Sequence, residues 1–184
     1  FNDAGNFMRS DFLTIENPMA LAASATNFSN AYQMFGTIFG EYAINDDLKL
    51  KLNIGGDARF QRRDVFVDRQ SQRGAALGGI ATISNGFQSN YLVEFTTSYQ
   101  KKIENHSFNL LGGFMDQEFT TVRSNQSAAN FPNDITKTDN IGLGDRETYQ
   151  MGSNKFKNRL ISFLGRLNYS YMGKYLFTTS FRAD

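Results

Sequence analysis

The sequence contains no cysteine and no tryptophan, and its 184 residues include only two prolines and one histidine. Without cysteine the chain cannot form disulfides, and with a single histidine it cannot assemble a zinc site from these ligands. His106 falls in a predicted tight turn, where a turn residue is a simpler interpretation than a general base. We therefore predict no catalytic residues, no metal site and no cofactor.

Long apolar runs and charge of one sign are also missing. No segment approaches the ~20 apolar residues that a spanning helix needs. The 19 basic and 18 acidic residues are interspersed and give a net charge of +1. Without a basic stripe we expect no nucleic-acid partner. The negative mean hydropathy does not oppose a transmembrane β-barrel, because every second residue of a barrel strand faces a polar interior.

The residues that are abundant favour strands and turns. The 18 phenylalanines and 8 tyrosines accompany many Thr, Asn, Ser and Gly residues. In residues 48–61, apolar side chains such as Leu50 and Leu52 alternate with polar ones such as Lys51. This period of two continues well beyond the ~5–6 residues usual for a strand. Including this segment, the sequence predicts six strands, near residues 34–44, 48–63, 89–103, 106–122, 157–171 and 174–184.

The connections between the predicted strands alternate strictly in length. Short polar turns are expected at 45–47, 104–106 and 172–174, and long polar loops at 64–86 and 124–156. Outer-membrane barrels have short periplasmic turns and long extracellular loops. The predicted fold class is all-β, an antiparallel up-and-down meander. Lipid tolerates no open sheet edge and single-chain barrels begin at about eight strands, so six strands must belong to a larger barrel.

Tyrosines are concentrated near the short turns, where their amphipathic rings suit a membrane interface; they are Tyr42, Tyr99, Tyr169, Tyr171 and Tyr175.

Alternation also predicts which face of the sheet meets lipid. The side chains predicted to point outward are Leu50, Leu52, Ile54, Val93, Phe95, Leu110, Phe163 and Phe177. Those predicted to point inward are Lys51, Asn53, Glu94, Asn109, Arg166 and Thr178.

One long loop is rich in oxygen-bearing side chains. Within residues 133–147 these are Asp134, Asp139, Asn140, Asp145 and Glu147. We consider them candidates for contact with a substrate or a partner. Their spacing matches no defined calcium loop, and a solvated loop that only shields the barrel mouth remains the alternative.

Beyond these patterns, the segment Leu160–Asp184 closely resembles a hairpin of SusC/RagA-type TonB-dependent transporters. Residues 17–20, Asn-Pro-Met-Ala, resemble an Asn-Pro segment of an extracellular loop in that family. Residues 48–59, 79–85, and 108–113 with Phe119 follow the order and spacing of the family. The resemblance therefore extends over most of the chain.

The resemblance implies a 22-stranded barrel in the bacterial outer membrane with an N-terminal plug domain, energised through TonB. It further implies a SusD-like surface lipoprotein as partner and oligosaccharides, sometimes peptides, as substrates. Because the chain begins with Phe1 and ends within a predicted strand, we expect it to be an internal piece of the barrel domain, without the plug. On this interpretation residues 1–33 are the remainder of an extracellular loop and 34–184 form three hairpins.

Two other interpretations remain open at this point. The first is a TonB-dependent receptor for a siderophore or cofactor, which would share the barrel. The second is a soluble β-sandwich carbohydrate-binding module, in which the abundant aromatics would form a sugar platform. The lack of tryptophan and the long alternating strands argue against the sandwich.

Overall fold

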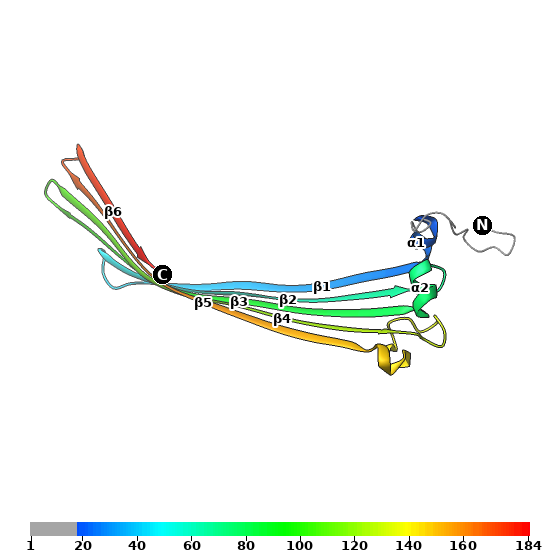
Figure 1. The fold of residues 1–184 in the computed structure, drawn as a ribbon. Helices are drawn as coiled ribbons and strands as arrows, with labels where there is room; N and C mark the ends of the chain where they lie inside the picture. Colours follow the sequence, from blue (N-terminus) through cyan, green and yellow to red (C-terminus); the bar gives the residue numbers. More distant parts are fainter. Residues whose placement is uncertain (1–17) are drawn as a thin grey trace. The chain divides into compact units, whose positions relative to one another are not determined.

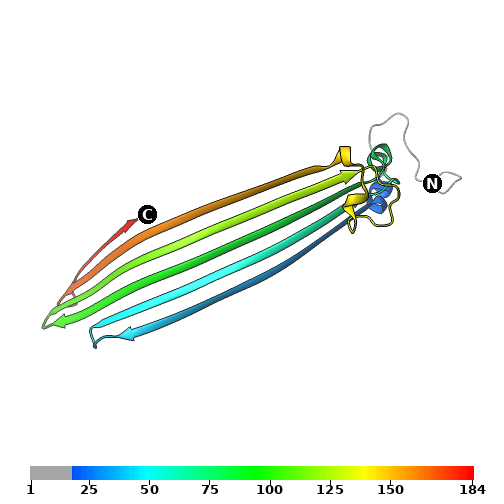
Figure 2. The ribbon, with the colours of Figure 1, turned by 90° about the horizontal axis from the view of Figure 1, so that it is seen from below.

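The computed structural model describes residues 18–184, and strands dominate it (Figure 1). In chain order the elements are α1 (Pro18–Ser24), β1 (Ala25–Ala43), β2 (Leu48–Val67), α2 (Gln72–Leu77), β3 (Ile80–Ile103), β4 (His106–Ala129), η1 (Ile141–Leu143), η2 (Arg146–Thr148), β5 (Gln150–Tyr171) and β6 (Tyr175–Ala183). The six strands form one sheet in sequence order, β1 to β6 (Figure 2). The predicted all-β meander is thus confirmed, and this order contains no Greek-key crossover of the kind that a sandwich module requires.

Most strands are longer than the sequence predicted. β3 begins at Ile80 instead of near residue 89, and β5 begins at Gln150 instead of near 157. β4 continues to Ala129, beyond the predicted end at 122. β1 begins at Ala25 instead of near residue 34, so residues 25–33 belong to a strand, and residues 18–24 form the short helix α1; residues 1–17 lie outside the described part.

The connections are correspondingly shorter. The long ones occupy residues 68–79 and 130–149, instead of 64–86 and 124–156, and the first contains α2. The three tight turns are confirmed, with shifts of a residue at their ends. In the first, the Asn45 side-chain oxygen accepts from the backbone N–H groups of Asp47 and Leu48, each at 2.9 Å. No helix within residues 18–184 has the length and apolar character needed to cross a membrane.

The chain divides into two compact units, which we describe separately. The turn unit carries the tight turns and comprises Gln33–Arg59, Gln88–Thr121 and Phe156–Asp184. Among the described residues, the loop unit comprises 18–32, Phe60–Phe87 and Val122–Lys155, and it carries the helices and the long connections.

In the turn unit, side-chain contacts agree with the predicted assignment of faces. Phe163 packs on Phe114 with 5.4 Å between ring centroids, and Tyr169 lies opposite Phe177 in the β5–β6 register. These residues share what we call the apolar face. The Asn53 amide donates to Glu94 at 3.4 Å, and Asn168 lies opposite Thr178. These residues belong to the opposite, polar face, and Lys51 lies there too, over the ring of Phe39.

In the loop unit, a small hydrophobic core joins three strands to the second long connection. It consists of the buried residues Phe66, Ala81, Ala128 and Phe131, with Ile141 and Tyr149 packed against it. The rings of Phe66 and Phe131 meet edge to face, 5.7 Å apart between centroids. Aromatic pairs favour this geometry, and it adds to the free energy of burying both rings. The second long connection is therefore anchored at its start rather than free.

Candidate functional site

The two long connections are fastened to each other by Arg69 and Asp134. The Arg69 guanidinium donates to the Asp134 carboxylate and to the carbonyl oxygen of Phe131. The backbone N–H of Arg69 donates to the other Asp134 oxygen at 3.2 Å. Both side chains are about one-third exposed, so solvent weakens the ion pair, but the three contacts together fix the start of the second connection.

Backbone hydrogen bonds continue this junction beyond the ion pair. The N–H of Asn130 donates to the Leu77 carbonyl at 2.8 Å, and the N–H of Phe131 donates to that of Gly78 at 2.8 Å. Gly78 ends α2 with φ of 65°, and a Cβ there would lie 2.7 Å from the side-chain oxygen of Asn130. Only glycine therefore fits this close approach without strain.

We expect Arg69→Ala to loosen this junction. The substitution removes an ion pair and leaves the Phe131 carbonyl without its side-chain donor, a loss of about 1 kcal/mol or somewhat more. In the full-length protein, limited proteolysis should then cut within residues 130–149 faster than in the unsubstituted protein. Arg146→Ala, on an exposed residue of η2, is the matched control and should leave the cleavage rate unchanged.

A hollow beside α2 in the loop unit has a hydrogen-bonding lining. We call it the α2 hollow; it has a volume of about 750 Å³, within the range of ligand pockets. Ser84 contributes from β3, Asn125 and Ser127 from β4, and Gln150 from β5. Arg73 of α2 is the one charged residue among the described residues of this lining, and it is exposed.

The residues that line the α2 hollow occur at every second position along its strands. Thr82 and Ser84 are two residues apart on β3, as are Asn125 and Ser127 on β4, so each pair points to one face. Hydroxyl and amide groups can both donate and accept hydrogen bonds. The arrangement suits a ligand with many hydroxyl or amide groups and at most one anionic group, which would lie near Arg73.

The structure does not gather the five predicted loop residues into this hollow. Asp134 is held by Arg69, and Asp145 caps η2 by accepting from the backbone N–H of Glu147 at 3.1 Å. Asp139, Asn140 and Glu147 are exposed. In residues 18–184 no three His, Cys, Asp or Glu side chains are close enough to hold a metal ion. Contact of the five predicted loop residues with a substrate or partner stays a prediction.

An aromatic cluster stands at the tight turns of the turn unit. His106, which the sequence placed in a turn, is the first residue of β4, and its Nδ1 lies 2.7 Å from the Tyr169 hydroxyl. Its ring also contacts Tyr171 and Phe108. His106 belongs to the apolar face because it alternates with Phe108, a signal that was present in the sequence.

A charged tier interrupts the same face further along the strands. Arg159 donates to both Asp116 oxygens, at 2.8 and 2.7 Å, and Lys157 lies 2.8 Å from Glu118. Tyr91 donates to Glu118 at 3.3 Å. On β5 the stretch between Arg159 and Tyr169 matches the ~9–11 residues with which a barrel strand crosses a bilayer. We call the part of the apolar face between these two groups the apolar band. It is bounded on one side by aromatic rings and on the other by ion pairs.

No protein-family model matches the chain, but individual proteins do. The chain is 29% identical over 170 residues to TonB-dependent receptor P3 of Formosa agariphila. It is 23% identical over 171 residues to TonB-dependent receptor SusC of Bacteroides thetaiotaomicron. Each match covers 92% of this chain. The resemblance to the SusC/RagA-type TonB-dependent receptors is confirmed.

Solved structures agree with the fold. The RagAB peptide transporter superposes with a TM-score of 0.80 over 88% of this chain, at 19% identity, and the match is 18% of that transporter chain. The RagAB peptide importer in its closed-closed state gives a TM-score of 0.78 over 87% of this chain. The sheet therefore matches a section of a TonB-dependent receptor barrel. The similarity in sequence to the receptors P3 and SusC agrees with the predicted outer-membrane location. The chain spans only 17% of the length of the P3 receptor.

Proposed function

We propose that this chain forms part of the wall and extracellular end of a TonB-dependent outer-membrane importer of oligosaccharides or peptides. The observation that carries the proposal is the apolar band of the turn unit. One face is apolar between the aromatic cluster and the charged tier, over the length of a bilayer crossing. The other face carries polar groups such as Asn53 and Glu94, as the interior of a wide barrel does. Transport, rather than catalysis, is the role that this arrangement supports.

The placement of the α2 hollow supports a part in substrate binding. The period of two along β3 puts Ser84 on the same face as Asn90 and Glu94, which is the polar face. The hollow would then open toward the barrel interior near the extracellular end. Its hydroxyl and amide lining suits the hydroxyls of a sugar or the backbone of a peptide.

The long connections are the parts of the chain that a partner outside the cell could reach. We propose that residues 68–79 and 130–149 contact a SusD-like surface lipoprotein, the substrate, or both, and that the tight turns face the periplasm. Contact with TonB would be made through a plug region outside this sequence. The hydrophobic core and Arg69 support this proposal, because they hold both connections in an ordered layer. A loop that only fills space does not need such order.

Uptake by the full-length receptor tests this proposal. A panel of oligosaccharides and peptides first identifies a nutrient whose uptake needs the receptor gene. Ser127→Trp should then lower uptake of that nutrient at subsaturating concentration by roughly tenfold, because the indole fills the α2 hollow and removes one or two hydrogen bonds. Arg73→Ala should lower uptake further when the nutrient is anionic.

Ser153→Trp provides the matched control. Ser153 is exposed on β5 and alternates with Gly152, which lines the hollow, so the same side chain is introduced on the opposite face. Its uptake and its surface level should equal those of the parent receptor. Equal uptake in the Ser127→Trp and parent receptors, at equal surface level, would show that the hollow does not contact the substrate.

A further inference from the structure

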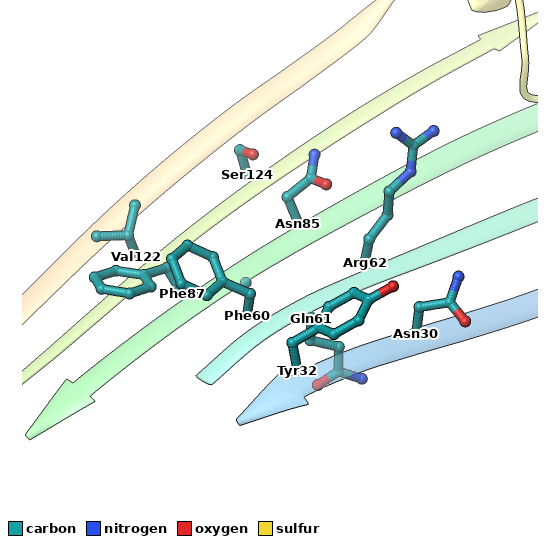
Figure 3. A pocket seen from close by; sticks show the side chains of 10 residues that line it. Asn30, Tyr32, Phe60, Gln61, Arg62, Asn85, Phe87, Val122 and Ser124 are labelled. Atoms are coloured by element: carbon teal, nitrogen blue, oxygen red, sulfur yellow. The ribbon is translucent and has the colours of Figure 1, made fainter. Parts of the chain in front are cut away.

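A second hollow lies in the loop unit, and the proposed import function does not use it. We call it the aromatic hollow; it has a volume of about 300 Å³. The rings of Phe60 and Phe87, 4.7 Å apart between centroids, line it together with Val122, and Tyr32 stands at its edge (Figure 3). Phe60 is 54% exposed, whereas Phe66, further along the same strand, is 1% exposed in the small core. The aromatic hollow is therefore an uncovered apolar surface next to a covered one.

The rim of the aromatic hollow carries polar side chains that are free to bind a ligand (Figure 3). Within the described residues, the side chains of Asn30, Asn85 and Ser124 have no hydrogen-bond partner. On the other face of the same sheet polar side chains pair with each other, as where the Gln61 amide donates to Ser29 at 3.2 Å. Unpaired amides are costly in hydrocarbon, so this rim suits water and a polar ligand rather than lipid.

The one charged residue among the described residues that line the aromatic hollow is already paired. Arg62 donates through its Nε to both carboxylate oxygens of Asp64, at 3.0 and 2.9 Å. A phosphate group or an acidic sugar would therefore meet no free cation in the lining, and a cationic ligand would meet no free carboxylate. The lining thus favours a ligand without charge, whose groups match neutral amides and hydroxyls.

The aromatic hollow and the α2 hollow are on opposite faces of the sheet. On β3, Ser84 lines the α2 hollow and Asn85 lines the aromatic hollow, and on β4 the same holds for Asn125 and Ser124. Successive side chains of a strand point to opposite faces. Because we propose that the α2 hollow opens toward the barrel interior, the aromatic hollow faces away from the import route.

We propose that the aromatic hollow binds a neutral oligosaccharide and holds it on the outer surface of the barrel wall. A pyranose ring has a face of C–H bonds, which packs on the rings of Phe60 and Phe87, and hydroxyls at its edge, which hydrogen-bond to Asn85 and Ser124. This chemistry is shared by nutrient polymers and by polysaccharide of the cell's own surface. The placement on the outer surface rests on the proposed function, whereas the choice of a neutral sugar rests on the lining alone.

Isothermal titration calorimetry on the purified full-length receptor tests the site. Every protein in the series carries Ser127→Trp, which fills the α2 hollow, and the detergent has no sugar headgroup. Neutral oligosaccharides from nutrient polymers and from the cell's own surface polysaccharide are titrated separately, and the series that binds identifies the source. Phe87→Ser should weaken that binding by about tenfold, because it removes one of the two stacked rings. The matched control, Phe28→Ser, changes a phenylalanine that is 66% exposed and lies outside the hollow, and should leave the binding unchanged.

Asn85→Ala keeps the test decisive if Phe87→Ser fails to fold, and it should weaken binding several-fold by removing a hydrogen bond. Unchanged affinity in both variants, or no binding in either series, would overturn the site. Tighter binding of uronic-acid oligosaccharides than of neutral ones would overturn the choice of an uncharged ligand. Nutrient uptake in the Ser127→Trp receptor tests the proposed function, and sugar binding by the same receptor tests the aromatic hollow, so either proposal can fail without the other.

Discussion

Leu52→Arg in the full-length receptor is expected to lower its stability in a bilayer by about 2–4 kcal/mol. Leu52 lies in the apolar band, and 43% of it is exposed in the isolated sheet. In the proposed barrel this exposed surface of Leu52 is covered by lipid. A guanidinium at that depth must either lose its hydration or draw water and headgroups into the hydrocarbon. Urea titration of the receptor refolded into lipid vesicles measures the loss directly.

Asn53→Arg is the control, since it places the same charge one residue along β2. Asn53 is on the polar face beside Glu94, where a cation meets water and a carboxylate. We expect a change within about 0.5 kcal/mol, typical of an exposed position. The reverse ranking, with Asn53→Arg the more damaging substitution, would contradict the assignment of faces, because a shift of one residue exchanges the two faces of a strand.

The part of the fold that could be read from the sequence is the part where the two faces differ chemically. In the turn unit, alternation between residues such as Leu52 and Asn53 gave the strands, their order and the tight turns. The strand ends in the loop unit were missed because this contrast is lost there. Residues such as Thr82 and Ser84 on one face are followed by Asn85 on the other, so no period of two is visible. Their pairing is fixed by neighbouring strands, which a local pattern cannot show.

The same reasoning explains why the candidate sites were missed. The five oxygen-bearing residues predicted from residues 133–147 are close in sequence, but they diverge along a connection that turns through η1 and η2. The α2 hollow instead combines Arg73, Ser84 and Asn125 from three segments, and none of these carries a motif. Only the pairing of β3 with β4 and the position of α2 bring such residues together. The charged tier was missed too, although Asp116 continues the alternating set of Phe108 and Phe114.

Phe66→Ala tests whether the small core holds the long connections in place. Phe66 is 1% exposed, and removing a buried phenylalanine ring costs about 3–5 kcal/mol. Because the core joins β2 to the start of the second long connection through Phe131, we expect this cost to appear as local opening of that connection. The amide protons of Asn130 and Phe131 should exchange with solvent roughly a hundredfold faster or more. Hydrogen exchange with mass spectrometry on peptides from this region measures that change.

The consequence for uptake follows from where the core lies. Ala128 belongs both to the core and to the lining of the α2 hollow, whereas Phe66 does not line the hollow. Phe66→Ala should therefore reduce uptake without removing any group that touches the substrate. Phe28→Ala, which truncates a phenylalanine that is 66% exposed, should change neither exchange nor uptake. Fast exchange with full uptake would mean that the hollow keeps its shape without the core, and the layer over the strands would then have no part in substrate binding.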